Sequence, residues 1–373
     1  MFHQFKFFGV VLTLSGLQPL RYSGVSESDK FWNYLYVNAL TFGSIVQFFV
    51  EGFSNESSFS RIVNRAQRDT VLGLEIWLLF QTLASLWIMR NSCLLYWEKH
   101  EKLLAKLENL CLLFGYNLHH MRWKYYSIVT FLIVTKAISV IIYIVELPEV
   151  SVLLMMLSIT FNGFTILTSM IETSIVINTL GVLFSHINNA KTSEVMFNRY
   201  AVVLLEMMDE VNHLYGLIFL LGVTHQFTWL MVVLYKNWIF PEEMALFRNE
   251  YLRCLNRIVI SPTIVILLDF MFTCHRTSQQ ANEAALSTRH FDDYSMKNTK
   301  LAKQINKFLL KNLHQKKKFS AFGFFNIDNS VIYTVFSSII TYLVILIQFK
   351  QLENDLTHGN SGNETISATG GST

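Results

Sequence analysis

Seven long apolar stretches constrain this chain more than any other feature of its sequence. A helix rises about 1.5 Å per residue, so about 20 apolar residues are needed to cross the hydrocarbon core of a bilayer. The stretches that meet this length lie at 31–53, 71–97, 125–147, 150–182, 215–237, 249–275 and 330–349. Charged residues make up 15% of the chain, against roughly 25% in ordinary soluble domains. The pattern predicts an all-α membrane protein with seven transmembrane helices.

The positions of the basic residues predict the orientation of these helices. Most of the 30 Lys and Arg residues lie before the first stretch, after the second, after the fourth and after the sixth. Loops rich in Lys and Arg stay in the cytoplasm, so we expect a cytoplasmic N-terminus and an extracellular C-terminus. Two N-glycosylation sequons, at Asn55 and Asn363, would both be external in this orientation.

Two amphipathic stripes indicate helices outside the membrane. Apolar residues recur at helical spacing from Met196 through Tyr200 and Met207 to Val211, and they run on into the fifth stretch. A second stripe starts at Leu301, with lysines on its other faces. Such a basic helix could lie on anionic lipid or pack into a cytoplasmic helical domain. The polar tail 351–373 is predicted to be disordered.

Charged and polar side chains inside the stretches are costly in a membrane and therefore mark candidate sites. Counting from each end places Arg90, Glu172 and Asp269 in the inner half, where Arg90 paired with Asp269 or Glu172 would form a structural clamp. Lys136 lies near the middle of the third stretch. The outer half holds a polar and aromatic set, which either lines a ligand cavity or joins helices by hydrogen bonds. Its members are Glu75, Trp77, Gln81, Tyr143, Asn162, His225, Gln226, Trp229, Arg253, Asn256 and Arg257.

The last apolar stretch carries a motif that is similar to a known family. It ends in Thr341-Tyr342, five apolar residues and then Gln348-Phe349, which resembles the terminal signature of insect gustatory receptors. The preceding segment, 324–330, reads Phe-Phe-Asn-Ile-Asp-Asn-Ser and also looks like the start of that family's last helix. Upstream of about residue 315 the resemblance rests on the architecture of the chain.

The resemblance implies a tastant-gated cation channel of the plasma membrane of chemosensory neurons. Four copies of the chain would form a homotetramer, or the chain would assemble with related receptor subunits. Each subunit would bind a small-molecule tastant within its bilayer-embedded bundle. The implied parts are a cytoplasmic segment 1–30, helices one to six with the outer ligand pocket in 31–275, a cytoplasmic anchor region 276–329, a pore-lining helix 330–349 and an extracellular tail 350–373.

The resemblance places the pore and its gate on the last helix. The residues assigned to them are Thr341, Tyr342, Ile345, Gln348 and Phe349. At the outer end, a ring of Phe349 side chains would form a constriction that gates by dewetting, and Gln348 amides would face permeant cations. The alternative is that Tyr342 and Gln348 are ordinary interfacial residues.

Other classes of protein fit less well. An odorant receptor has the same architecture as a gustatory receptor. A G-protein-coupled receptor needs an external N-terminus. It also needs an Asp-Arg-Tyr motif and an Asn-Pro-x-x-Tyr motif, which the corresponding helices of this chain lack. An enzyme would need a cluster of catalytic residues at membrane depth, and the sequence shows none. A transporter would normally show an internal repeat, and the sequence shows none. His225 has no companion at the spacing of a metal site, so neither a metal nor a cofactor is predicted. Basic patches interleaved with aromatics are lacking, so no nucleic acid is predicted.

Overall fold

The computed structural model describes residues 6–18, 27–53, 70–116, 119–146, 150–189, 194–235, 260–290 and 316–367. Most of these residues are helical. The helices are α1 (Lys6–Leu14), α2 (Glu27–Phe53), α4 (Thr70–Leu95), α5 (Trp97–Leu113), α6 (His119–Glu146), α7 (Val150–Asn189), α8 (Glu194–Leu234), α10 (Ser261–His290) and α12 (Asn329–Ser367). Two short strands, β1 (Ser320–Ala321) and β2 (Phe325–Asn326), pair antiparallel just before α12.

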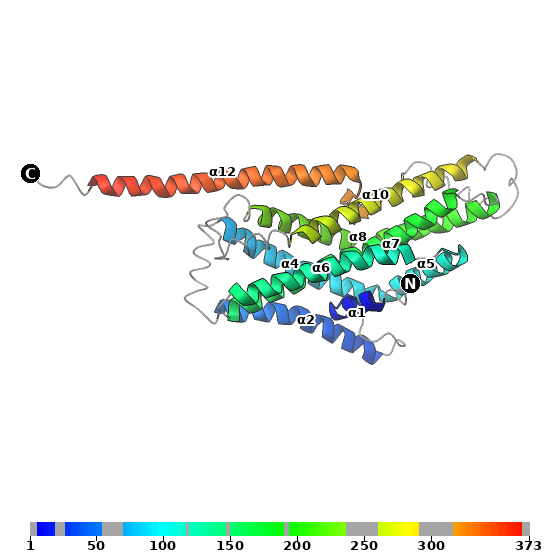
Figure 1. The fold of residues 1–373 in the computed structure, drawn as a ribbon, viewed down its shortest axis with the longest axis horizontal. Helices are drawn as coiled ribbons and strands as arrows, with labels where there is room; N and C mark the ends of the chain where they lie inside the picture. Colours follow the sequence, from blue (N-terminus) through cyan, green and yellow to red (C-terminus); the bar gives the residue numbers. More distant parts are fainter. Residues whose placement is uncertain are drawn as a thin grey trace, which may run out of the picture.

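The long helices lie alongside one another and alternate in direction, as a chain that crosses a membrane repeatedly must do (Figure 1). At one end of the bundle α5 lies with the last turns of α7 and α10 and the first turns of α8. We call this the α5 end. The last turns of α2 and α6 and the first turns of α4 and α7 lie at the opposite end, beyond which α12 projects.

Five helical segments among the described residues are long and apolar enough to span a bilayer. They are Trp77–Leu95, Met121–Val145, Leu157–Asn189, Arg199–Leu234 and Asn329–Phe349. These agree with five of the predicted stretches. The first predicted stretch coincides with α2, and the described part of the sixth, from Ser261, is the start of α10. Residues 249–259 of the sixth stretch, and the stripe from Leu301, lie outside the described residues.

α7 is the central helix of the bundle. It packs against α10, α8, α6, α2, α4 and α5. Gly181 allows the close approach of α10, because an added Cβ would collide with the hydroxyl of Thr277. That hydroxyl donates to the Ile177 carbonyl of α7 at 3.2 Å. A glycine facing a hydroxyl is a common way to bring two helices together in a membrane.

The apolar stripe predicted ahead of the fifth span is confirmed as part of one continuous helix, α8. Leu204, Met207 and Val211 are buried, and α8 runs without interruption into its membrane-spanning segment. The prediction of disorder for 351–373 is wrong for residues 351–367, because α12 continues to Ser367. Backbone hydrogen bonds within one helix need no apolar face, so the polar composition of this tail did not prevent it from extending α12.

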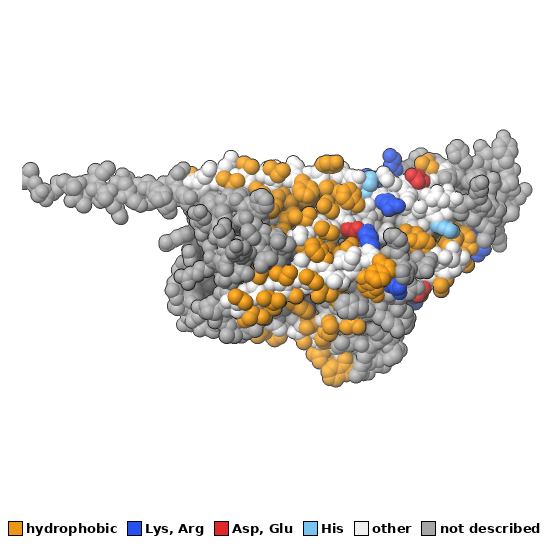
Figure 2. Space-filling view, viewed as in Figure 1, with side chains coloured by type: hydrophobic (Ala, Val, Ile, Leu, Met, Phe, Trp, Pro, Cys, Tyr) orange, Lys and Arg blue, Asp and Glu red, His pale blue; other side chains and the backbone are white. Residues whose placement is uncertain are grey.

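The described surface is divided by side-chain type. On the face shown in Figure 2, apolar side chains cover the middle of the bundle, and most charged and histidine side chains lie toward the α5 end. An exposed apolar surface of this extent is unsuited to water and suited to lipid.

Candidate functional site

Polar side chains with buried atoms occupy the half of the bundle away from α5. Four of them each leave one side-chain atom without a hydrogen-bond partner. These atoms are Gln81 Oε1, Asn162 Oδ1, His225 Nδ1 and Gln226 Nε2. They come from α4, α7 and α8, which pack against one another. All four residues belong to the set predicted from the sequence as a ligand cavity or as interhelical contacts.

His225 joins α8 to α4. Its Nε2 lies 2.8 Å from the hydroxyl of Thr82. That hydroxyl also donates to the Leu78 carbonyl at 2.7 Å, and a hydroxyl has a single hydrogen. His225 Nε2–H is therefore the donor to Thr82, which leaves Nδ1 as an unpaired acceptor. Interhelical hydrogen bonding, one of the two sequence interpretations, is thus correct for one atom of this side chain.

Aromatic and cationic groups from α6 lie in the same half of the bundle. The ammonium of Lys136 lies 5.8 Å from the centre of the Trp229 ring, a distance at which a cation is attracted to the ring face. The phenol of Tyr143 is hydrogen-bonded to Thr160 of α7. Lys136, Tyr143 and Trp229 therefore connect α6 to α7 and α8.

The unpaired atoms have a definite energetic meaning. A buried donor or acceptor that is left unsatisfied lowers the free energy of unfolding by about 1–3 kcal/mol. In native proteins such groups are nearly always hydrogen-bonded to protein, water or ligand. Two acceptor oxygens, one acceptor nitrogen and one amide donor are present here. A neutral molecule that carries both hydroxyl hydrogens and oxygen acceptors has the complementary chemistry.

The remaining residues predicted for the cavity are placed differently. The indole of Trp77 is 63% exposed on the outside of the bundle, where it would face lipid. Glu75 lies in the first turns of α4, but its side chain is outside the described residues, as are Arg253, Asn256 and Arg257. Asn363 lies within α12, and Asn55 falls outside the described residues.

The predicted clamp between Arg90 and an acidic residue is wrong. Arg90 is fully buried, and it donates to the Ser15 carbonyl and to the Thr41 hydroxyl, both at 3.0 Å. Ser15 follows the last turn of α1, where helix carbonyls lack partners and carry partial negative charge. Backbone and hydroxyl oxygens therefore take the place of a carboxylate at Nε and Nη1 of this guanidinium, while its Nη2 has no partner among the described residues.

The acidic residues of that predicted clamp have other partners. Asp269 of α10 lies 2.5 Å from the ammonium of Lys124 on α6. Glu172 of α7 lies 3.4 Å from Nε2 of His100 on α5. Sequence reasoning missed Lys124 and His100 because both lie just outside the apolar stretches, where a charged side chain is unremarkable.

A small cavity at the α5 end surrounds this histidine. It is lined by Leu17, Ser92, Cys93, Tyr96, Trp97, His100, Glu172, Leu214, Tyr215 and Ile218. His100 Nε2 is also hydrogen-bonded to the hydroxyl of Tyr215. Burial lowers the pKa of His100 to about 4, so the imidazole is neutral at neutral pH. The neutral imidazole joins α5 to α7 and α8 through Glu172 and Tyr215.

The predicted pore residues all lie on α12, on a span that is largely exposed in the single chain. Thr341, Tyr342, Ile345, Gln348 and Phe349 are exposed, and 6% of the most apolar part of the span is buried. Contacts with α8 hold one side of the helix.

Two contacts join α12 to α8. The ring of Tyr342 meets that of Phe227 edge to face, with centroids 6.3 Å apart. The hydroxyl of Tyr235 donates to the Leu346 carbonyl at 3.4 Å. α12 also contacts α10 and α4, but most of its described side chains remain exposed and could meet lipid or another protein.

The sequence of residues 5–353 matches the family described as 7tm chemosensory receptor. The chain belongs to this family. Insect gustatory and olfactory receptors of this kind are a class of ligand-gated channels, and they are not enzymes.

Similar proteins include several receptors of Drosophila melanogaster. The chain is 31% identical over 183 residues to gustatory and pheromone receptor 39a, isoform D, a match that covers 46% of each chain. It is 60% identical to gustatory receptor 68a over 50 residues, or 13% of each chain. It is 31% identical to the gustatory receptor for bitter taste 66a over 133 residues, which is 35% of this chain and 25% of that one. The first of these matches thus spans about half the length of the relative.

The fold has a counterpart among solved structures. It superposes on the insect olfactory receptor OR5 from Machilis hrabei with a TM-score of 0.58, over 92% of this chain and 97% of that one. The sequences are 13% identical, so this likeness concerns the fold alone. The family predicted from the last helix is confirmed by the sequence match over residues 5–353.

Proposed function

We propose that this chain is a subunit of a tastant-gated, non-selective cation channel. In this proposal it forms a homotetramer, or a tetramer with related subunits, in the plasma membrane of chemosensory neurons. α12 lines a central pore, and a small molecule bound within each subunit opens it. The N-terminus is cytoplasmic and the C-terminus extracellular.

The observation that carries the proposal is the exposure of α12. Its span is apolar, yet almost none of it is buried within the subunit. Lipid could cover such a helix, but Gln348 and Thr341 would then face hydrocarbon next to exposed Phe349 and Tyr342. Assembly around a shared axis would instead place one face of α12 toward water and the other toward neighbouring subunits.

The charge distribution supports the proposed orientation. The α5 end, which carries most of the charged side chains visible in Figure 2, would lie in the cytoplasm together with the anchor region 276–329. The half of the bundle that contains Asn162 and Gln226 would then be the outer half. We propose that the ligand pocket lies there and that the unpaired atoms of these side chains bind the hydroxyl and carbonyl groups of a tastant.

Replacement of the two residues at the outer end of the predicted pore tests the channel. In cells that express the full chain, Phe349→Ala should raise the ligand-independent current, because it removes the bulkiest part of a dewetting constriction. Gln348→Ala should change conductance or permeability ratios, because it removes the amide that a cation meets. Wild-type basal current, conductance and permeability in both variants would refute a pore lined by α12.

Two amide substitutions test the pocket. Asn162→Leu and Gln226→Leu should weaken the response to an active tastant by roughly tenfold each, since each removes a hydrogen bond to ligand. The stimuli are bitter compounds and pheromones, after the names of the relatives. Asn91→Leu is the matched control, because within the described part of the chain the Asn91 amide donates to the Trp87 carbonyl of its own helix and joins no second helix. Equal effects in all three variants would contradict a pocket at this position.

Glycosylation tests the orientation. In eukaryotic cells at least one of Asn55 and Asn363 should carry glycan, and a tag at the C-terminus should react with antibody on intact cells. A tag that reacts only after permeabilisation would contradict the proposed topology and would favour a G-protein-coupled receptor.

An odorant-gated channel subunit is the second candidate function. The fold shared with an insect olfactory receptor favours it, and the pore and topology would be the same. The stimulus separates the two. Activation by volatile odorants, with no response to bitter compounds, would assign the chain to this alternative.

A further inference from the structure

The segment before α12 is a short hairpin that lies against α8 and α10. Phe322 and Gly323 form its turn, with φ of 51° and 83°, and Phe324 N donates to the Ala321 carbonyl at 3.0 Å. Because Ala321 pairs with Phe325, three residues form the loop, and the positive φ of Phe322 and Gly323 turns the chain back tightly between the two strands. On α8, Gly216 leaves room for this turn, because an added Cβ would lie 3.2 Å from the backbone nitrogen of Phe322.

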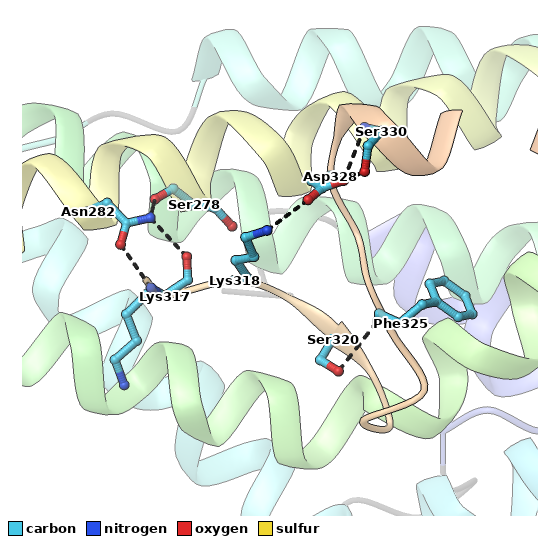
Figure 3. A network of polar contacts seen from close by, with 8 residues as sticks. All are labelled: Ser278, Asn282, Lys317, Lys318, Ser320, Phe325, Asp328 and Ser330. Carbon is cyan, nitrogen blue, oxygen red and sulfur yellow. Dashed lines mark hydrogen bonds and ion pairs between the residues drawn. The ribbon is translucent and has the colours of Figure 1, made fainter. Parts of the chain in front are cut away.

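An asparagine of α10 binds the start of this segment. Asn282 Oδ1 accepts from the backbone N–H of Lys317 at 2.8 Å, and its Nδ2 donates to the Lys317 carbonyl at 2.9 Å (Figure 3). The same Nδ2 also donates to the Ser278 carbonyl of its own helix at 2.7 Å. A side-chain amide carries the same donor and acceptor as a peptide group, so Asn282 pairs with Lys317 as a neighbouring strand would.

An asparagine of α8 binds the next residues of the segment. Asn212 Nδ2 donates to the Lys318 carbonyl at 3.0 Å, and its Oδ1 accepts from the N–H of Ser320 at 3.1 Å. Lys317 adds an ion pair with Asp209 of α8 at 2.6 Å. The chain at 317–320 is therefore bound to two different helices by four amide hydrogen bonds.

The other end of the hairpin leads directly into α12. Ile327 N donates to the Phe319 carbonyl at 2.8 Å. The carboxylate of Asp328 accepts from Ser330 N at 3.1 Å and from the Ser330 hydroxyl, which caps the first turn of the helix. Lys318 reaches the same carboxylate at 3.0 Å, as Figure 3 shows. No unbonded linker separates the asparagines from the first turn of α12.

We propose that Asn212 and Asn282 are positioning residues that fix the axial position of α12 against α8. Their amides hold the segment 317–320, the hairpin transmits that position to Asp328, and Asp328 sets the first turn of α12. A displacement of α8 or α10 at the α5 end is then passed on to α12. This inference rests on the proposed function only for its consequence, which is that such a displacement would move the pore.

Cross-linking measures the axial position directly. In native membranes that contain the full chain, the pair Phe227→Cys and Tyr342→Cys should react readily with a short bifunctional thiol reagent, because the native rings are in contact. Pairs of Phe227→Cys with Ser338→Cys or Leu346→Cys report α12 displaced by about one helical turn in either direction. Mass spectrometry of the digested protein quantifies each product.

Loss of both asparagines should change this pattern. In Asn212→Leu/Asn282→Leu we expect the product at 342, relative to those at 338 and 346, to fall by roughly fivefold for each asparagine lost. Asn282→Asp keeps the acceptor for Lys317 N–H and loses the donor, so it should show a smaller fall, and it serves if the double variant does not reach the membrane. Asn188→Leu is the control, because Asn188 also joins two helices, through the Gln280 carbonyl at 3.0 Å, but does not touch the hairpin.

The outcomes separate the inference from the proposed function. An unchanged ratio in the double variant and in Asn282→Asp, or an equal change in Asn188→Leu, would overturn the positioning role whether or not the channel conducts. A shifted ratio of cross-linked products supports the positioning role whether or not the protein conducts. Absence of current in both the wild type and Phe349→Ala would refute the channel and leave the positioning role standing.

Discussion

α7 and α12 are both long apolar helices, but they occupy opposite environments. Of the most apolar part of each helix, 89% is buried in α7 and 6% in α12. α12 is the more apolar of the two over its span, so apolar content does not predict burial here. In a bilayer the exposed helix needs apolar side chains, whereas the central helix can carry polar ones that bond inside the bundle.

The side chains of the two helices differ in the same way, with polar ones buried in α7 and apolar ones exposed on α12. α7 buries a series of polar residues, namely Asn162, Thr165, Thr168, Ser169, Glu172, Thr173, Ser174 and Thr179. α12 exposes large apolar ones, among them Tyr333, Phe336, Ile340, Val344 and Phe349. Several of the α7 hydroxyls donate to carbonyls one turn earlier, as Thr173 does to Ser169 at 2.8 Å, so their burial costs little.

The largest expected effect is the loss of a core aromatic from α7. Phe184 is completely buried, so Phe184→Ala should lower the free energy of unfolding by about 3–5 kcal/mol. Phe336→Ala, the same change at an exposed position of α12, should lower it by less than about 1 kcal/mol. Thermal unfolding of the purified full chain in detergent measures both.

This pair of variants can also sharpen the comparison. If α12 packs against neighbouring subunits, Phe336→Ala should reduce the tetramer fraction in native mass spectrometry without lowering subunit stability. Equal losses of stability in the two variants would mean that α12 is buried in the subunit to the same degree as α7.

A smaller effect is expected where α7 meets α10. Gly181→Ala would push a methyl group into the Thr277 hydroxyl, and overpacking of this kind costs about 1–3 kcal/mol. The control is Gly43→Ala on α2, where the added Cβ would have no atom within 4 Å beyond its chain neighbours and the backbone of its own helix. Since alanine favours a helix over glycine, that variant should gain up to about 1 kcal/mol. A thermal midpoint that rises for both variants would contradict the close contact.

The smallest effect concerns acid. Because burial lowers the pKa of His100 from 6.5 to about 4, the unfolded chain binds its proton first as the pH falls through 6.5. Stability contributed by the neutral imidazole is therefore lost on acidification, by on the order of 1 kcal/mol between pH 7.5 and pH 5.5. His100→Gln should remove this part of the pH dependence of the thermal midpoint. An unchanged pH dependence would place the titration elsewhere.

The start of α12 should respond to acid in a different range. Hydrogen bonds from Ser330 and Lys318 hold the pKa of Asp328 below its ordinary value of 3.8. The stability that this cap contributes is present above that pH and is lost only below it. Between pH 7.5 and pH 5.5 the acid response should therefore come from the surroundings of α7 and not from the start of α12.

Sequence reasoning succeeded wherever the signal was local. Predicted spans coincide with helices because the length and apolarity of a membrane helix are set by the bilayer. The ending from Thr341 to Phe349 identified the family because its residues are contiguous. The same reasoning missed the hairpin at 320–326, although Gly323 marks a possible turn, because strands of two residues are too short to show alternation.

The sequence by itself determined that this chain is a helical membrane protein of the chemosensory receptor family, and where most of its spans lie. Only the tertiary structure decided which polar groups meet. Arg90 bonds to the end of α1 instead of an acid, and Asn212 finds Lys318 across 106 positions of the chain. A hydrogen bond acts over about 3 Å of space whatever the separation in sequence, so such pairings follow from the packing of the helices and not from composition or spacing.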